Sequence, residues 1–235
     1  SVGRGNIAIG MDTMANTIPY ELNGNNVSIG NFAGHCITSG ESHVMIGYNA
    51  GCLQTTGNSN VFIGNEAGRK TTTAINSIAI GKEALLDNTT GTNLAIGNSA
   101  LANVTTGNFN TAIGNESLYS NTTGGTNVAI GADALKANTT AGSNVAVGTG
   151  TLCTTTTGAG NTALGECAMK ANTTGNLNVA VGHRSLCANT TGYGNISIGQ
   201  CSMKSNTEGF RNIAVGQFSL CDNTTGDYNT ALGYA

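Results

Sequence analysis

Short apolar runs recur along the chain, and each one follows an asparagine and ends at a glycine. A clear copy is Asn127-Val-Ala-Ile-Gly131. In an extended strand Val128 and Ile130 would share one face, whereas Ala129 would point to the other. Both faces are apolar, so the pattern predicts a short strand that is buried on both sides.

The closing glycines define a repeat. They stand 20 residues apart once and then 17 apart, with one spacing of 16. The unit reads N-[VIT]-A-[IVL]-G-x-x-[AS]-[LM]-x-x-N-T-T-G-x-x, and we number its places 1 to 17 from the asparagine. The closing glycines are Gly10, Gly30, Gly47, Gly64, Gly81, Gly97, Gly114, Gly131, Gly148, Gly165, Gly182, Gly199, Gly216 and Gly233. Fourteen starts of one unit indicate a repeat array.

The array extends over the whole chain as a single domain, residues 1–235, with degenerate coils over 1–76 and regular coils over 77–235. Gly51 and Gly68 replace the usual leucine of place 9, and the first unit carries an insertion around Pro19. The last unit stops at Ala235, seven residues in, so we expect this chain to be part of a longer fibre.

The unit length selects an all-β architecture. Seventeen residues are too few for a helix-pair repeat. Glycines at places 5 and 15 are expected to supply unusual backbone angles at two corners. Each unit then forms one coil of a parallel β-solenoid, about fourteen coils in all, in which asparagines form amide ladders and threonines line a pleated surface.

The apolar character of both strand faces predicts self-association. A thin coil can enclose only one face, so the other needs a partner surface. Parallel coils around a threefold axis would provide one, and we therefore expect a homotrimer of intertwined or packed coils.

Composition removes several classes of protein. The chain has 35 glycines, 1 proline and no tryptophan, with 39% hydrophobic residues and a net charge of −3. Disorder requires fewer hydrophobic residues and more charge, and collagen requires abundant proline. A pI near 5.5 argues against nucleic-acid binding. The apolar runs are far too short for membrane insertion.

The motif N-x-A-I-G-x-x-A/S resembles the head repeats of YadA-like trimeric autotransporter adhesins. The longer unit NTAIGNESLYSNTTGGT, residues 110–126, is still more similar to repeats in tail-fibre proteins of bacteriophages and large viruses. This resemblance covers Asn6 to Gly233 and implies a left-handed, trimeric parallel β-roll. The repeats are scaffold in those families, so it implies no binding residue.

Catalytic chemistry has little support, and we predict no enzyme, no cofactor and no metal site. His35, His43 and His183 have no acid or nucleophile in phase with them. His43 stands at place 1, where asparagine is usual, and is expected to substitute for it in the ladder. Corner carboxylates such as Glu66 and Glu83 are expected to face water. The regular aspartate of calcium-binding rolls is absent.

Five cysteines follow a two-unit period. Cys153, Cys187 and Cys221 occupy place 10, whereas Cys167 and Cys201 occupy place 7 of the units between them. Disulfides between adjacent coils would join Cys153 to Cys167 and Cys187 to Cys201, or else Cys167 to Cys187 and Cys201 to Cys221. The alternative is that all five are small apolar fillers. Cys36 and Cys52 have no evident partner.

These features favour a structural or adhesive fibre shaft of a virus, phage or cell surface, extracellular or virion-displayed, that carries a receptor-binding tip. Tyr193, Phe210, Phe218 and Tyr228 are candidate surface contacts with a host receptor or glycan, gaining strength from copy number. The alternative is an ice-binding solenoid whose threonines at place 14 form a row. The N-T-T corner also creates N-glycosylation sequons.

Overall fold

Strands of three residues recur once per sequence unit, as expected for a solenoid. The computed structural model describes residues 5–16 and 24–234, and this part contains strands, turns and bends but no helix. The insertion expected around Pro19 lies outside the described residues. The chain divides into two compact units, residues 1–116 and 117–235, each described below by itself.

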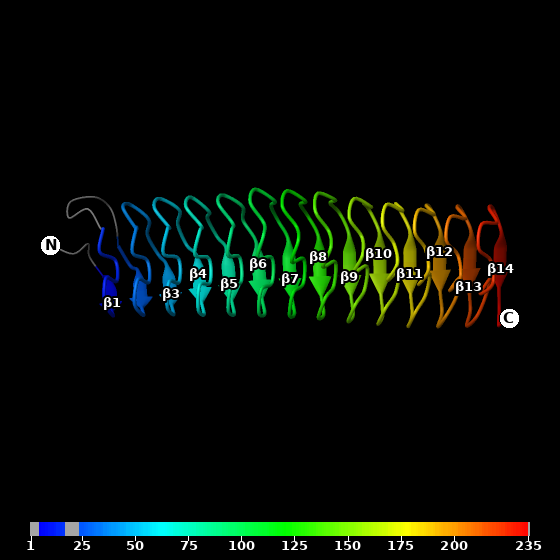
Figure 1. Ribbon diagram of the computed structural model, residues 1–235, viewed down its shortest axis with the longest axis horizontal. Helices are drawn as coiled ribbons and strands as arrows, with labels where there is room; N and C mark the ends of the chain where they lie inside the picture. Colours follow the sequence, from blue (N-terminus) through cyan, green and yellow to red (C-terminus); the bar gives the residue numbers. More distant parts are fainter. Residues whose placement is uncertain (1–4, 17–23, 235) are drawn as a thin grey trace. The chain divides into compact units, whose positions relative to one another are not determined.

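The first unit contains seven strands in chain order (Figure 1). Each pairs in parallel with the next, and residues at the same place of the repeat are partners, as in Ile78↔Leu94. The strands are β1 (Ile7–Ile9), β2 (Val27–Ile29), β3 (Val44–Ile46), β4 (Val61–Ile63), β5 (Ile78–Ile80), β6 (Leu94–Ile96) and β7 (Thr111–Ile113).

The second unit repeats this arrangement, again with parallel pairing in register from each strand to the next. Its strands are β8 (Val128–Ile130), β9 (Val145–Val147), β10 (Thr162–Leu164), β11 (Val179–Val181), β12 (Ile196–Ile198), β13 (Ile213–Val215) and β14 (Thr230–Leu232). The chain is therefore a parallel β-solenoid with one coil per 17-residue unit, which confirms the predicted fold class.

The interior of each regular coil is filled by small residues and one leucine or methionine. In the coil of β8, Ala129 at place 3, Ala134 at place 8 and Leu135 at place 9 are all fully buried. Leu135 has φ 52°, in the left-handed region that a leucine rarely adopts. That conformation costs about 1–2 kcal/mol, so burial of the side chain must offset it.

The corners differ from those predicted. Place-5 glycines do have strongly positive φ, as in Gly131 at 132°. Place-15 glycines such as Gly158 do not, so that expectation is wrong. Gly158 is needed for space instead, because a Cβ there would overlap the Gly175 carbonyl oxygen of the next coil. The remaining left-handed positions lie mainly at places 7, 9 and 17, and most of them are non-glycine residues, for example Asp133 and Ser143.

Early coils that look degenerate have a rearranged core. Where place 9 is Gly51 or Gly68, place 3 of the same coil is the large Met45 or Phe62 instead of alanine, and both large side chains are fully buried. A Cβ on Gly68 would lie 2.8 Å from carbon atoms of the Phe62 ring. The interior volume is thus supplied from place 3 in these coils and from place 9 in the regular ones.

Two asparagine columns form the predicted amide ladders inside the coils. At place 12, Asn138 Nδ2 donates to Asn121 Oδ1 at 2.9 Å and to the Ala141 carbonyl at 3.1 Å. At place 1, Asn144 N donates to Asn127 Oδ1 at 3.0 Å. Asn121 and Asn138 are sequon residues, and both are fully buried. A glycan on either amide would therefore exclude it from the folded coil.

Within one chain the strands are buried on one side only, and the predicted burial of the second face by a partner chain stays a prediction. Place-3 residues such as Ala129 point inward and are fully buried, while their neighbours at places 2 and 4 are part-exposed. We call the surface made by places 2 and 4 the outer sheet face. Within one chain, this face is open to solvent.

Candidate functional site

The outer sheet face presents an apolar surface in each unit. Its residues are valine, isoleucine, leucine and, at three positions, threonine, and none is charged. In the end strands Ile7, Ile9 and Leu232 are 49%, 57% and 75% accessible. In the inner strands the better exposed residues are between 36% and 39% accessible; they are Ile78, Ile80, Ile130, Leu164, Ile196, Ile198 and Ile213. Because the strands pair in register, this apolar stripe repeats with each coil.

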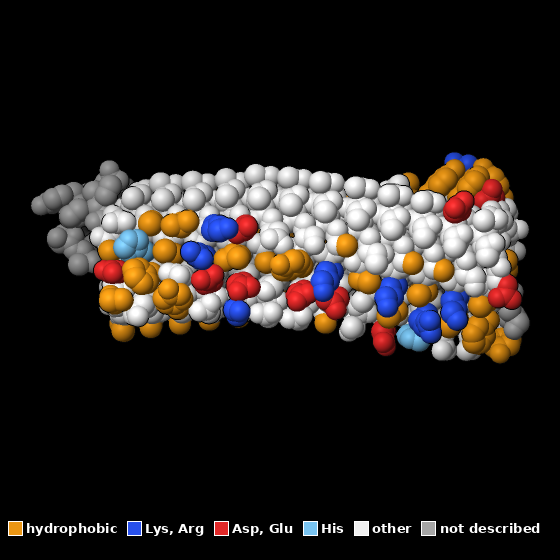
Figure 2. Space-filling view, in the orientation of Figure 1, with side chains coloured by type: hydrophobic (Ala, Val, Ile, Leu, Met, Phe, Trp, Pro, Cys, Tyr) orange, Lys and Arg blue, Asp and Glu red, His pale blue; other side chains and the backbone are white. Residues whose placement is uncertain are grey.

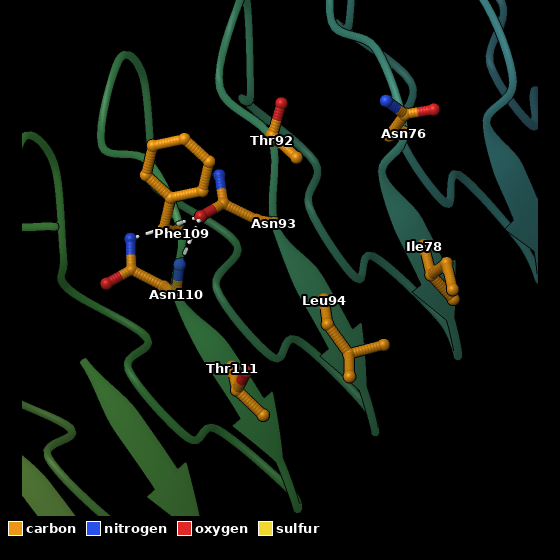
Figure 3. Close-up of a pocket in the computed structure, with 8 residues that line it drawn as sticks. All are labelled: Asn76, Ile78, Thr92, Asn93, Leu94, Phe109, Asn110 and Thr111. Carbon is orange, nitrogen blue, oxygen red and sulfur yellow. Dashed lines mark hydrogen bonds between the residues drawn. The ribbon is translucent and has the colours of Figure 1, made fainter. Parts of the chain in front are cut away.

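A pocket of about 300 Å³ hollows the edge of this face in the first unit (Figure 3). It lies where the 16-residue unit, 77–92, lacks place 17, and its lining includes Ile78, Leu94 and the 70%-exposed Phe109. Its amides belong to the ladder, since Asn110 donates to Asn93 Oδ1 from both N (2.9 Å) and Nδ2 (3.1 Å). The pocket is an apolar notch without converging reactive groups.

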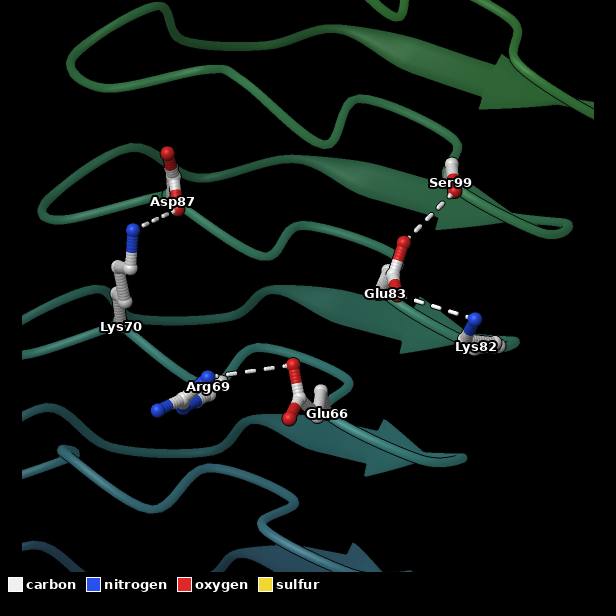
Figure 4. Close-up of polar contacts among 7 residues, drawn as sticks. All are labelled: Glu66, Arg69, Lys70, Lys82, Glu83, Asp87 and Ser99. Carbon is white, nitrogen blue, oxygen red and sulfur yellow. Dashed lines mark hydrogen bonds and ion pairs between the residues drawn. The ribbon is translucent and has the colours of Figure 1, made fainter.

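Charged side chains of the first unit pair with opposite charges, not with like charges (Figure 4). Glu66 Oε2 lies 3.3 Å from Arg69 Nη1, and Lys70 Nζ lies 2.8 Å from Asp87 Oδ1. Glu83 contacts Lys82 at 3.2 Å and accepts from Ser99 Oγ at 3.2 Å. Each of these three carboxylates is therefore paired with a cation.

His43 takes the place of asparagine in the ladder, as predicted. Its backbone N donates to Asn26 Oδ1 at 2.9 Å, and its Nδ1 accepts from Asn60 N at 3.2 Å. The ring thus reproduces the acceptor function of the asparagine amide, whereas its buried Nε2 makes no hydrogen bond. Burial is the main reason that the pKa of His43 falls from 6.5 to about 4, and the ring is neutral at pH 7. This is a structural role.

All seven cysteines are free thiols in the structure. Cys153 and Cys167 lie close enough to interact electrostatically, and Cys153 Sγ contacts the Lys170 carbonyl at 3.7 Å. Burial raises the pKa of Cys153 above its usual value, which disfavours the reactive thiolate. The alternative pairings of Cys153, Cys167, Cys187, Cys201 and Cys221 stay predictions.

Cys36 and Cys52, which showed no partner in the sequence, lie on adjacent coils. Cys36 N donates to the Cys52 carbonyl at 3.0 Å. The pKa of Cys52 is raised, mainly by burial and to a smaller extent by the nearby Cys36 thiol. The sequence did not indicate this proximity because the two cysteines occupy different places of the repeat, 11 and 10.

Three of the four candidate contact residues come together on the second unit. Tyr193 and Phe210 stack with ring centroids 4.8 Å apart and an interplanar angle of 4°, and Tyr228 meets Phe210 edge-on at 5.3 Å. Phe218 lies elsewhere, against Tyr234 at 6.1 Å. Figure 2 shows hydrophobic and basic side chains gathered over the last coils.

Arg211 completes this aromatic group and was not identified from the sequence. Its guanidinium carbon lies 5.8 Å from the Tyr193 ring centroid and 5.7 Å from that of Tyr228, and Nη1 donates to the Tyr228 hydroxyl at 2.9 Å. Their shared position in the repeat could have predicted the cluster. Places 16 and 17 of consecutive units hold Tyr193, Phe210, Arg211 and Tyr228. We call these four residues the aromatic–arginine cluster.

Searches for other kinds of site gave two negative findings. Among the described residues, no group of three or more His, Cys, Asp or Glu side chains is arranged to hold a metal ion. Within residues 5–16 and 24–234 there is also no helix of the length and apolarity that a membrane crossing requires.

Comparison with known protein families, with curated proteins and with solved structures finds no match to this chain. Two surfaces of the described residues are candidates for function, the outer sheet face and the aromatic–arginine cluster.

Proposed function

We propose that the chain is the shaft of a homotrimeric structural or adhesive fibre, displayed on a virion or outside a cell, which holds a receptor-binding tip away from the surface. The single observation that carries this proposal is the uncharged outer sheet face, left open in one chain. Apolar surface that recurs on coil after coil is rare on a soluble monomer and is typical of an interface.

The spacing of this face favours copies of the same chain as its partner. A partner that covers this face must present apolar groups at the spacing of the coils. A second copy of the chain has the same repeat and therefore the same spacing. The notch beside Phe109 lies at the edge of the same face, so a neighbouring copy would also cover it. Three parallel copies would bury the outer faces around one axis, in a closed assembly.

The test is the mass of the chain in solution, by native mass spectrometry or light scattering. We expect three times the 23.5 kDa of one chain. Replacing Ile196 and Ile198 of β12 by lysine should shift this mass toward the monomer, because buried lysines without partners are strongly unfavourable. The matched control is Thr191→Lys, at an exposed place-14 position on a neighbouring coil. A wild-type monomer at all concentrations would refute the trimer.

An ice-binding solenoid is the second candidate, and the structure offers it one column of side chains. Place-14 threonines such as Thr140 and Thr174 are exposed. The adjacent place-13 threonines are half-buried, and their hydroxyls already donate to the next coil, as Thr139 does to the Thr156 carbonyl at 3.2 Å. A flat two-column array is therefore not formed. Thermal hysteresis measurements decide this alternative, and we expect no activity.

A further inference from the structure

The aromatic–arginine cluster departs from the repeat in a way that other columns do not. At places 16 and 17 most coils carry small or polar residues, for example Asn58-Ser59, Gly125-Thr126 and Ala159-Gly160. Three consecutive coils of the second unit instead carry Tyr193, Phe210-Arg211 and Asp227-Tyr228. The coil closes without large side chains at these places, so folding does not account for the aromatic rings.

The rings are presented to solvent. Tyr193 is 40% exposed and Tyr228 is 65% exposed, and Arg211 is exposed as well. Stacking and edge-on contacts fix the ring planes, and Arg211 ties one end of the cluster to the Tyr228 hydroxyl at 2.9 Å. An exposed apolar surface that is held rigid in this way loses little entropy when a ligand binds.

Polar groups of both signs border the rings. The Arg211 guanidinium has five N–H donors, of which the Tyr228 hydroxyl accepts from one nitrogen. Asp227 uses Oδ1 to accept from Phe210 N at 2.9 Å, and Glu208 is exposed in the same turn region. One basic and two acidic residues do not favour an anionic ligand. They suit a neutral molecule that offers both hydroxyl donors and acceptors.

We propose that the aromatic–arginine cluster binds a neutral hexose unit of a surface glycan. The apolar C–H face of the sugar ring would lie on the exposed aromatic rings, and its hydroxyls would bond Arg211 and Asp227. This inference rests on the proposed fibre function, of which it specifies the partner. One such contact is weak, and three copies in a trimer would strengthen it through avidity.

The experiment measures binding of the assembled full chain to immobilised neutral oligosaccharides of glucose, galactose or mannose, beside carboxylated sugars of similar size. The test variant combines Phe210→Asn, Arg211→Ser and Tyr228→Ser, which places residue types there that the array itself uses at these places. We expect a loss of about tenfold or more, since roughly 1.4 kcal/mol corresponds to a factor of ten. The control is Phe218→Ser, an aromatic residue outside the cluster.

Each other outcome overturns the inference in a distinct way. A trimer that binds no neutral sugar refutes the site but leaves the fibre proposal intact. Preference for carboxylated sugars, weakened by salt, would refute the neutral ligand. A cluster variant whose mass falls to that of the monomer would assign the cluster to contacts between chains. If the wild-type chain is a monomer, the fibre proposal fails, and the binding data on that monomer still decide the site.

Discussion

At several places of the repeat, a side chain forms a hydrogen bond with the residue at the same place of the adjacent coil. Asparagine does this at places 1 and 12 because its amide both donates and accepts without carrying charge. A column of like charges at the same spacing would repel. The substitution of His43 shows that the acceptor function is the one the place-1 column requires, because the neutral imidazole still accepts from Asn60 N through Nδ1. This equivalence holds only while the ring is unprotonated.

His43 should make stability depend on pH. Its pKa is about 4 in the folded chain and 6.5 when unfolded, so the unfolded state binds the extra proton between these values. Stability should be constant above pH 6.5 and fall by up to about 3 kcal/mol as the pH drops to 4. His43→Asn should remove this component. Denaturant unfolding at pH 4.5 and 7 measures it, and an unchanged pH slope in the variant would contradict the assignment.

At the scale of one coil, the sequence predicted the strand and missed the way the coil turns. A short apolar run that closes at a glycine in phase with the repeat marks each described strand correctly, because alternation and a closing glycine are local signals. The left-handed leucines and methionines at place 9, such as Leu135 and Met169, could not be predicted. Their conformation is unfavourable locally and is imposed by packing inside the coil, which no single unit reveals.

Core volume in a coil should be exchangeable between places 3 and 9. Gly68→Leu alone should destabilise the chain by about 1–3 kcal/mol, because its Cβ would overlap the Phe62 ring. Phe62→Ala alone should cost about 3–5 kcal/mol by leaving a cavity. The double variant recreates a regular coil, with leucine in a left-handed position that other coils already use.

A double-mutant cycle, measured by chemical denaturation, gives the coupling between these two positions. We expect the double variant to be more stable than either single one. Additive losses would show that the two core arrangements are not interchangeable.

For the whole molecule, the sequence predicted that the second strand face is apolar and needs a partner surface, and in one chain this face is open to solvent. Alternation shows that both faces of Val128–Ile130 are apolar. It cannot show whether the second face is covered by the same chain or by another. Likewise, the aromatic residues at places 16 and 17 were visible as exposed candidates. Their stacking and the role of Arg211 became visible only when consecutive coils were aligned in space.

If assembly buries the outer sheet faces, thermal stability must depend on protein concentration. Mass action stabilises the associated folded state, so the unfolding midpoint should rise when concentration is raised tenfold. Scanning calorimetry at two concentrations measures this shift. The Ile196→Lys, Ile198→Lys variant should show a smaller shift. A midpoint independent of concentration in the wild-type chain would indicate that the outer face stays open.

The coil that lacks place 17 shows how the length of a turn can change while the coils stay stacked. Although this unit has only 16 residues, Thr92 N still donates to Asn108 Oδ1 at 2.9 Å, and Asn93 N still reaches Ser77 Oγ at 3.3 Å. A deletion in that turn therefore leaves both neighbouring ladders connected. The 20-residue spacing from Gly10 to Gly30 gives the same result for an insertion, because Ile7 and Val27 still pair in register. A change of length is thus absorbed within one turn, and the stacking of the other coils is kept.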